Sequence, residues 1–365
     1  MRKRISAIIN KLNISIMMMI VVLMIGCGQQ AVEARKDGAA GGEKQGAGSL
    51  SEVLMEVGKS AENAFYSFLE LVSDTLGFTA KSTTKKSDVG DYFTALGKKL
   101  GEASAELEEV AKKSEIEGSK DSLLNKAIRA AVDTAKTTLN TLKTRLDSLK
   151  DIGNANKVGE AASDAAGTAV DDVELKKAYN ALKGIVDEAG KSGIAKPEAG
   201  ATTLKVDNAD NKDGAKILAT DNKPAATDAS KAAMILATVS EEEMLASIVN
   251  STEGDAALAA AATAQTSAVS FAKGGTAANL AGADAAKAAA VAGGIALRSL
   301  IKTGKLASAA AGQGGQGEVQ AVGVAAVNKL LVAVEDIIKK TVKNVLDKVK
   351  QEVDKARAPK AASQK

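Results

Sequence analysis

The chain lacks histidine and tryptophan, has a single cysteine, and only 2% of its 365 residues are aromatic. Without histidine there is no imidazole base, no Ser-His-Asp triad and no histidine-ligated metal site. One cysteine permits neither an internal disulfide nor a metal site built from several cysteines. Apolar residues still make up 45% of the chain, which is long enough for a sizeable core. An enzyme that uses carboxylates and lysines alone is the alternative, but these absences favour a protein without enzymatic activity, cofactor or metal.

The first 26 residues have the pattern of an export signal. No acidic residue precedes Glu33, the first residues are basic, and an apolar run follows from Ile14 to Ile25. A basic start, a short apolar stretch and a small residue at its end are typical of a secretory signal peptide. A retained membrane-spanning helix is the alternative, but such a helix needs about 20 apolar residues. We therefore predict that residues 1–26 are a signal peptide.

The lone cysteine, Cys27, directly follows this run. With the preceding Met24-Ile25-Gly26 it resembles the lipobox of bacterial lipoproteins, although Met24 stands where leucine is commoner. The resemblance implies cleavage between Gly26 and Cys27, a diacylglycerol group on the Cys27 sulfur and an acyl group, such as palmitoyl, on its new amine. Several acyl chains anchor a protein stably, since each buried methylene contributes about 0.8 kcal/mol. A chance thiol in an ordinary signal peptide is the alternative interpretation.

Removal of the signal peptide would change the charge of the protein. Residues 1–26 carry four positive charges and no negative one, so the net charge falls from +3 to −1. A nearly neutral chain gives no support to nucleic-acid binding through a basic surface. The segment 27–48 that follows is Gly-rich and polar, and we predict that it is a lipidated flexible tether.

Apolar residues recur at three- and four-residue steps near both ends of the remaining chain, as in amphipathic helices. The predicted helices cover 50–72, 91–116, 120–152 and 319–355, with a loop at 81–88. The stripe on the last helix needs a partner surface, which the N-terminal helices provide most simply. It also permits, without requiring, association into a homodimer.

We therefore expect a mostly α-helical fold, an elongated helical bundle. An N-terminal helical base, 49–152, and a C-terminal helix, 318–355, would pack together near the membrane. The last ten residues, 356–365, form a predicted disordered tail.

The middle of the chain, 153–317, is rich in Ala and Gly and poor in large side chains. Because small side chains bury little area per residue, we expect this region to depend on the outer helices and to form a membrane-distal cap of helices and loops. A short strand is predicted near Thr203–Val206. The predicted helices of this region cover 170–189, 228–249, 254–273 and 282–303.

Three short motifs in this region have structural explanations. Residues 312–317 spell GxGxxG, but they follow an Ala-rich helical stretch and not a strand, so we interpret them as a loop. The acidic run Glu241–Glu243 follows Ser240 and is typical of a helix start. The pair Gly293-Gly294 lies inside a helical pattern, where it would allow close helix packing at a cost in helix propensity.

Several longer blocks resemble a known family. VLMEVGKSAENAFYSFLELVSDTLGFTAKSTTKKSDVGDYF (53–93) and AVNKLLVAVEDIIKKTVKNVLDKVKQEVDK (326–355) resemble the constant N-terminal part and the C-terminal helix of the variable large proteins of Borrelia spirochaetes. AGGIALRSLIKTGKLAS (292–308) resembles an invariable segment shared with the related Vls surface antigen. With the lipobox, the resemblance covers essentially the whole chain.

The resemblance implies an outer-surface lipoprotein antigen, lipid-anchored in the cell outer membrane and facing the exterior. It implies one of a set of plasmid-borne variants, expressed one at a time, whose switching evades host antibodies. Only Cys27 carries over as a functional residue, and no catalytic motif does. The alternative function is an adhesin that binds a host molecule on the same scaffold.

Overall fold

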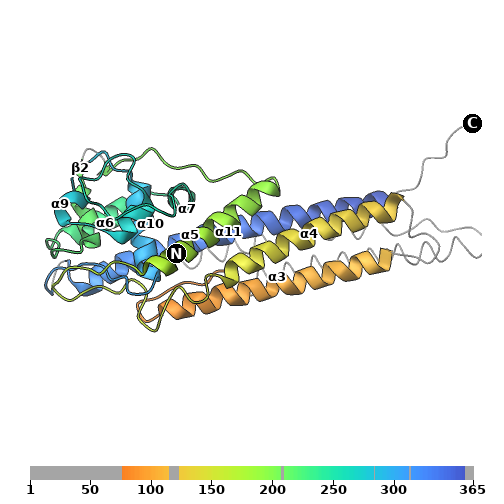
Figure 1. The fold of residues 1–365 in the computed structure, drawn as a ribbon, viewed down its shortest axis with the longest axis horizontal. Helices are drawn as coiled ribbons and strands as arrows, with labels where there is room; N and C mark the ends of the chain where they lie inside the picture. The colour runs from red at the N-terminus through yellow and green to blue at the C-terminus, as the bar shows by residue number, and fades with distance from the viewer. Residues whose placement is uncertain (1–75, 115–122, 207–208, 283, 312–313, 358–365) are drawn as a thin grey trace, which may run out of the picture. The chain divides into compact units, whose positions relative to one another are not determined.

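The structure is a computed structural model, and it describes residues 76–114, 123–206, 209–282, 284–311 and 314–357. The predicted signal peptide, tether and first helix lie outside these residues. The fold is mostly α-helical, as predicted, and Figure 1 shows the arrangement of its elements.

Three long helices carry the bundle: α3 (Lys86–Ser114), α4 (Leu123–Asp147) and α11 (Gln316–Arg357). Of the elements described, α3 and α4 share the most extensive contact, and α11 packs along α4 (Figure 1). Large aliphatic side chains at steps of three and four residues bury the seam between them, which is the pattern of coiled-coil-like packing. These side chains include Leu96, Leu100 and Leu107 of α3 and Leu139, Leu142 and Leu146 of α4. The predicted packing of the N-terminal helices against the C-terminal helix is confirmed for α4, along which α11 lies.

The ends of these helices differ from the predicted ones. The loop expected over 81–88 ends early, because α3 already begins at Lys86, where the Asp88 carboxylate accepts a hydrogen bond from the Lys85 amide (2.8 Å). The helix expected to reach Ile152 ends at Asp147. The chain turns there and brings Gly153 against α3, where a Cβ would lie 2.5 Å from the Lys86 carbonyl. At the other end of the chain, α11 extends two residues into the predicted tail.

The middle region contains shorter elements, which begin with α5 (Asp172–Lys191). They continue with strands β1 (Lys205–Val206) and β2 (Ala209–Asp210), the 3-10 helix η1 (Lys212–Leu218), α6 (Asp228–Ala237), α7 (Glu241–Val249), α8 (Ala268–Lys273), α9 (Ala277–Leu280) and α10 (Ala288–Leu300). The strands pair antiparallel, with Lys205 opposite Asp210 and Val206 opposite Ala209. The predicted strand is therefore present in its last two residues.

Two of the helix predictions for this region were wrong in part. The span 228–249 is two helices, because Ser240 starts a new one: its hydroxyl accepts from the Glu243 amide (3.1 Å), and the Glu243 carboxylate accepts from the Ser240 amide (2.8 Å). This capping box confirms the helix start predicted at the acidic run. The span 254–273 is helical only from Ala268 onward. Before it the chain runs irregularly, and Leu258 forms a bridge with Gly275 instead.

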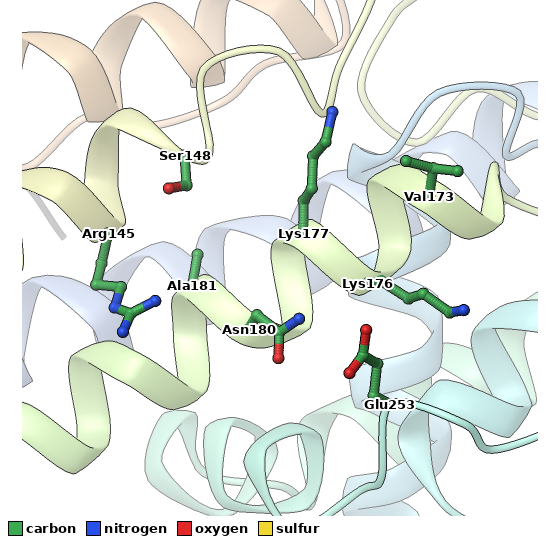
Figure 2. A pocket seen from close by; sticks show the side chains of 8 residues that line it. All are labelled: Arg145, Ser148, Val173, Lys176, Lys177, Asn180, Ala181 and Glu253. Carbon is green, nitrogen blue, oxygen red and sulfur yellow. The ribbon is translucent and has the colours of Figure 1, made fainter.

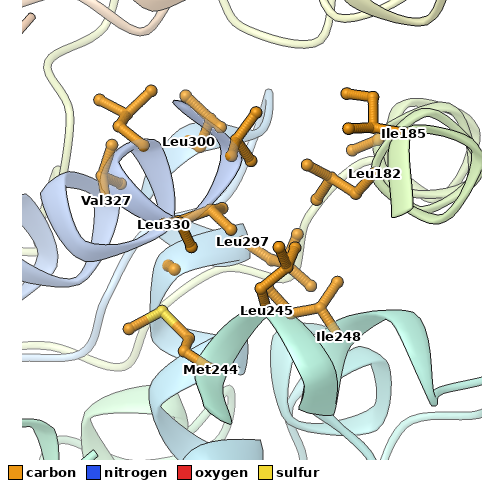
Figure 3. Close-up of a cluster of buried hydrophobic side chains, with 14 of the residues drawn as sticks. Leu182, Ile185, Met244, Leu245, Ile248, Leu297, Leu300, Val327 and Leu330 are labelled. Carbon is orange, nitrogen blue, oxygen red and sulfur yellow. The ribbon is translucent and has the colours of Figure 1, made fainter. Parts of the chain in front are cut away.

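Helix α10 lies at the centre of the middle region, and all 13 of its residues are buried. It packs mainly on α8, α11 and α7. Figure 3 shows large side chains of α5, α7, α10 and α11 meeting in one cluster, among them Leu182, Leu245, Leu297 and Leu330. The expected dependence on the outer helices is seen in the contact with α11, but the middle region also has an interior of its own.

The pair Gly293-Gly294 makes this interior possible. A Cβ on Gly293 would lie 2.9 Å from the Ala268 and Ile248 side chains, and one on Gly294 would lie 2.5 Å from Phe271 Cβ. Atoms that close cannot coexist, so α8 can approach α10 only where glycine stands. The predicted close packing at this pair is confirmed.

Candidate functional surface

The predicted lipidation site, Cys27, and the predicted cleavage point after Gly26 lie outside the described residues, so both stay predictions. Across the described ranges, no helix is long and apolar enough to cross a membrane. Within those same ranges, no group of three or more acidic or cysteine side chains is placed to hold a metal ion.

Exposed loops of the middle region carry mainly small and polar side chains. Five alanines between Ala256 and Ala261 are exposed, as are most residues of 220–227. The alanine loop is nevertheless fixed at two points, because the Leu258 amide donates to the Gly274 carbonyl (2.7 Å) and the Ala262 amide donates to the Asn279 carbonyl (2.8 Å). The surface thus combines exposure with a defined backbone path.

Neighbouring loops are also tied to one another. The Thr220 amide donates to the Gly275 carbonyl (3.0 Å), and the Asp221 carboxylate accepts from the Ala277 amide (2.8 Å). Lys223 forms an ion pair with Asp164 (2.6 Å) that joins two loops distant in sequence. Substitution of exposed side chains between such anchor points is expected to change stability by only about 0.5 kcal/mol.

The buried Arg298 of α10 binds the ends of two helices that lead into these loops. Its guanidinium is fully buried, and it donates to the carbonyls of Ala272 (2.8 Å, from Nε) and Leu218 (3.1 Å, from Nη1). These carbonyls belong to the last turns of α8 and η1, where helices leave acceptors unpaired. Burial lowers the pKa of Arg298 to about 9, so the side chain stays charged at neutral pH. Gly274, at φ +82°, leaves the space that the guanidinium occupies.

Lys86 joins the middle region to the base. Its ammonium is buried and donates to the carbonyls of Ile301 (2.8 Å) and Gly304 (2.6 Å), just beyond the end of α10. Burial lowers the pKa of Lys86 to about 8, while the nearby Glu160 carboxylate acts in the opposite direction. The first turn of α3 is thereby connected to the C-terminal end of α10.

A third polar cluster fixes the segment before α3 on α11. The Glu335 carboxylate accepts from the Tyr92 hydroxyl and from the Gly77 amide (3.1 Å). Asn328 pairs with both backbone groups of Ala80, accepting from its amide (2.8 Å) and donating to its carbonyl (3.1 Å). Burial raises the pKa values of Glu335 and Tyr92 above their ordinary values. We call residues 77–80 with these α11 partners the N-terminal clasp.

An open depression of about 370 Å³ lies between the end of α4, the first half of α5 and the loop after α7. Figure 2 shows Arg145 at one end, Val173 at the other, and Asn180 and Glu253 between them. Lys176 and Lys177 line it as well, and each forms an ion pair with an acid of α5.

The sequence pattern of the family described as Borrelia lipoprotein matches residues 61–353. The chain belongs to the Borrelia lipoprotein family. Variable large proteins 25 and 21 of Borrelia hermsii are 68% and 67% identical to it, each over the whole of both chains. Variable large protein 12 of the same organism is 30% identical over 97% of this chain and 92% of its own.

The fold also has a counterpart of known structure. The crystal structure of the Lyme disease variable surface antigen VlsE of Borrelia burgdorferi matches with a TM-score of 0.69 at 26% identity, over 84% of this chain and 99% of that one. Two chains that share about a quarter of their residues therefore have the same scaffold. The family resemblance predicted from the sequence is confirmed.

Three supports of this scaffold were not predicted from the sequence. The sequence places Lys86 in a predicted loop and Arg298 inside an Ala-rich helical pattern, and it gives Glu335 of the C-terminal helix no special role. The sequence could have pointed to Arg298, because its neighbours in 291–301 are otherwise apolar or small and a charged residue among them needs hydrogen-bond partners. No comparable signal marks Lys86, because its carbonyl partners lie more than 200 residues away.

Proposed function

We propose that this protein is an outer-surface lipoprotein antigen, one of a set of antigenically distinct variants whose switched expression evades the host immune response. The observation that carries the proposal is the identity of 62–68% with four variable large proteins over 98–100% of the chain. The likeness to VlsE, a variable surface antigen by its printed name, supports the same function.

Anchoring is proposed through Cys27, with a diacylglycerol group on the sulfur and an acyl group on the amine, at the outer face of the outer membrane. The segment 27–48 would then serve as the tether, 49–152 and 318–355 as the base, and 153–317 as the variable membrane-distal region. The exposed, well-anchored loops of the middle region support this division, because they present side chains that can change at little cost in stability.

Protease treatment of intact cells tests the surface location. We expect rapid loss of the wild-type protein while a periplasmic marker stays intact. The Cys27→Ser variant should leave the membrane fraction, since its covalent lipid is lost. Resistance of the wild-type protein to the protease would contradict surface display. Retention of the Cys27→Ser variant in the membrane would contradict the lipid anchor.

Epitope mapping tests the proposed division. Antibodies raised against intact cells should bind mainly to residues of 153–317 and should fail to recognise a variant that differs there. Predominant binding to residues of 50–150 would contradict a variable middle region, while leaving the surface location untouched.

Adhesion to a host molecule is a second candidate function. The observation that favours it is the open depression beside the exposed guanidinium of Arg145, which has no ion-pair partner among the residues that the structure describes.

A further inference from the structure

Arg145 of α4 is an exposed arginine that lines this depression. Its side chain is exposed, and within the ranges that the structure describes it forms no hydrogen bond and no ion pair. Most cations around it are matched: Lys143 pairs with Asp147 (2.5 Å), Lys176 with Asp172 (3.6 Å) and Lys177 with Glu174 (3.1 Å). The guanidinium therefore keeps its full set of donors for an outside partner.

The position of this guanidinium is fixed by shape and not by a partner charge. Arg145 belongs to α4, and its guanidinium lies against Gly184 of α5. A Cβ added at Gly184 would lie 2.4 Å from Arg145 Nε and 2.9 Å from its Cζ. Inside a helix, glycine is less favourable than alanine. Because Gly184 has no side chain, the Arg145 side chain can pack against α5, and its guanidinium lies at one end of the depression (Figure 2).

The rest of the depression defines what fits beside the guanidinium. The exposed Asn180 amide also lacks a hydrogen-bond partner in the described ranges, and it lies on the same wall as Ala181. At the far end stands Val173, the most exposed large apolar side chain described, at 62%. Arginine binds a carboxylate through two parallel hydrogen bonds, and an apolar group next to that carboxylate would cover Val173.

The acidic residues of the rim decide between classes of anion. Glu253 lies on the wall opposite α5 without a partner in the described ranges, and Asp172 and Glu174 stand beside the two lysines. A polyanion such as a sulfated glycan would meet these carboxylates along its length. A peptide with a single carboxylate would place it at Arg145 and leave Glu253 in solvent.

We propose that this depression binds an acidic peptide segment of a partner protein, with an Asp or Glu carboxylate held by Arg145 and Asn180 and an apolar neighbour held against Val173. The proposal gives the second candidate function a site and a ligand chemistry. It does not depend on the surface-antigen role, which the protease and epitope experiments test separately.

The experiment titrates the full-length chain in detergent with a terminally blocked peptide that contains Glu-Val, and follows the Arg145 Nε–H and Asn180 amide resonances. We expect saturable shifts with a millimolar dissociation constant, and no shift with the matched Gln-Val peptide. The Arg145→Gln variant should bind about tenfold more weakly, since it loses the bidentate, charge-assisted pair. The Lys150→Gln variant removes an exposed cation that does not line the depression and should bind as wild type does.

The Gly184→Ala variant gives a second, independent reading. The added methyl group should displace the guanidinium and weaken peptide binding, while helix propensity keeps the thermal midpoint equal or raises it. Three results would overturn the proposal: no saturable shift with the Glu-Val peptide, equal binding by wild type and Arg145→Gln, or binding of a heparin tetrasaccharide in place of the peptide.

Discussion

The helical base and the middle region bury their interiors by opposite means. Between α3, α4 and α11, large leucines at regular steps fill the space between helices. Around α10, by contrast, alanines and glycines let backbones approach closely, and the buried cations Arg298 and Lys86 supply the missing hydrogen bonds. Leucine seams adapt to small changes of shape, whereas glycine contacts leave no space to adapt. The two regions should therefore differ in which substitutions they tolerate.

The largest effect is expected at the glycine contact of α10. Gly294→Val would place a branched side chain where Phe271 Cβ lies 2.5 Å from the first added carbon. Overpacking against such fixed atoms is expected to lower the free energy of unfolding by about 3 kcal/mol. Urea unfolding followed by circular dichroism measures it.

The matched control is Gly317→Ala in the first turn of α11, where an added Cβ meets nothing within 4 Å. This variant should be as stable as wild type, or more stable by up to about 1 kcal/mol. Equal losses in both variants would show that glycine matters here through helix propensity and not through close contact.

A smaller, pH-dependent effect is expected at Lys86. Its pKa is lowered to about 8 in the folded protein, below the ordinary 10.5, so the unfolded chain binds more protons between these values. Stability contributed by this residue therefore rises with pH across that window. Relative to Lys86→Met, the wild type should gain about 2 kcal/mol of unfolding free energy between pH 7.5 and pH 10.

Equilibrium unfolding of both proteins at the two pH values measures this difference. Because the comparison is between two proteins, the titration of the other lysines cancels. A difference that stays constant between pH 7.5 and pH 10 would contradict the buried, weakened base at Lys86.

The contrast between the regions also decides what could be predicted from the sequence. Helices α3, α4 and α11 were predictable because leucine and valine periodicity reports directly which face is buried. The run 254–267 was predicted as helix from its alanines, yet tertiary pairing of Leu258 with Gly275 outweighs alanine's local preference. The depression at Arg145 could not be predicted, because its walls come from two helices and a loop that only the fold brings together.

A moderate loss is expected when Glu335, the α11 acceptor of the N-terminal clasp, loses the hydrogen bond that Tyr92 of α3 donates to it. Tyr92→Phe removes the hydroxyl that donates to the buried Glu335 carboxylate, and bonds to charged groups contribute more than neutral ones. We expect a loss of about 1.5 kcal/mol. Tyr179→Phe is the matched control in the middle region, since that hydroxyl donates to the neutral Ser251 carbonyl (2.8 Å). A larger loss in Tyr179→Phe than in Tyr92→Phe would contradict a charged acceptor in the clasp.

The smallest effect is expected in the leucine seam itself. Leu142→Met keeps the volume of a fully buried side chain of α4 and adds flexibility, so the loss should stay below about 1 kcal/mol. The same exchange at Leu297 of α10, equally buried, should cost more, because its surroundings are held by glycine contacts and by Arg298 one residue away. Urea unfolding of the two variants compares them directly. Equal losses would mean that the regions differ in composition but not in how tightly their neighbours are fixed, and the contrast between base and middle region would then rest on the glycines alone.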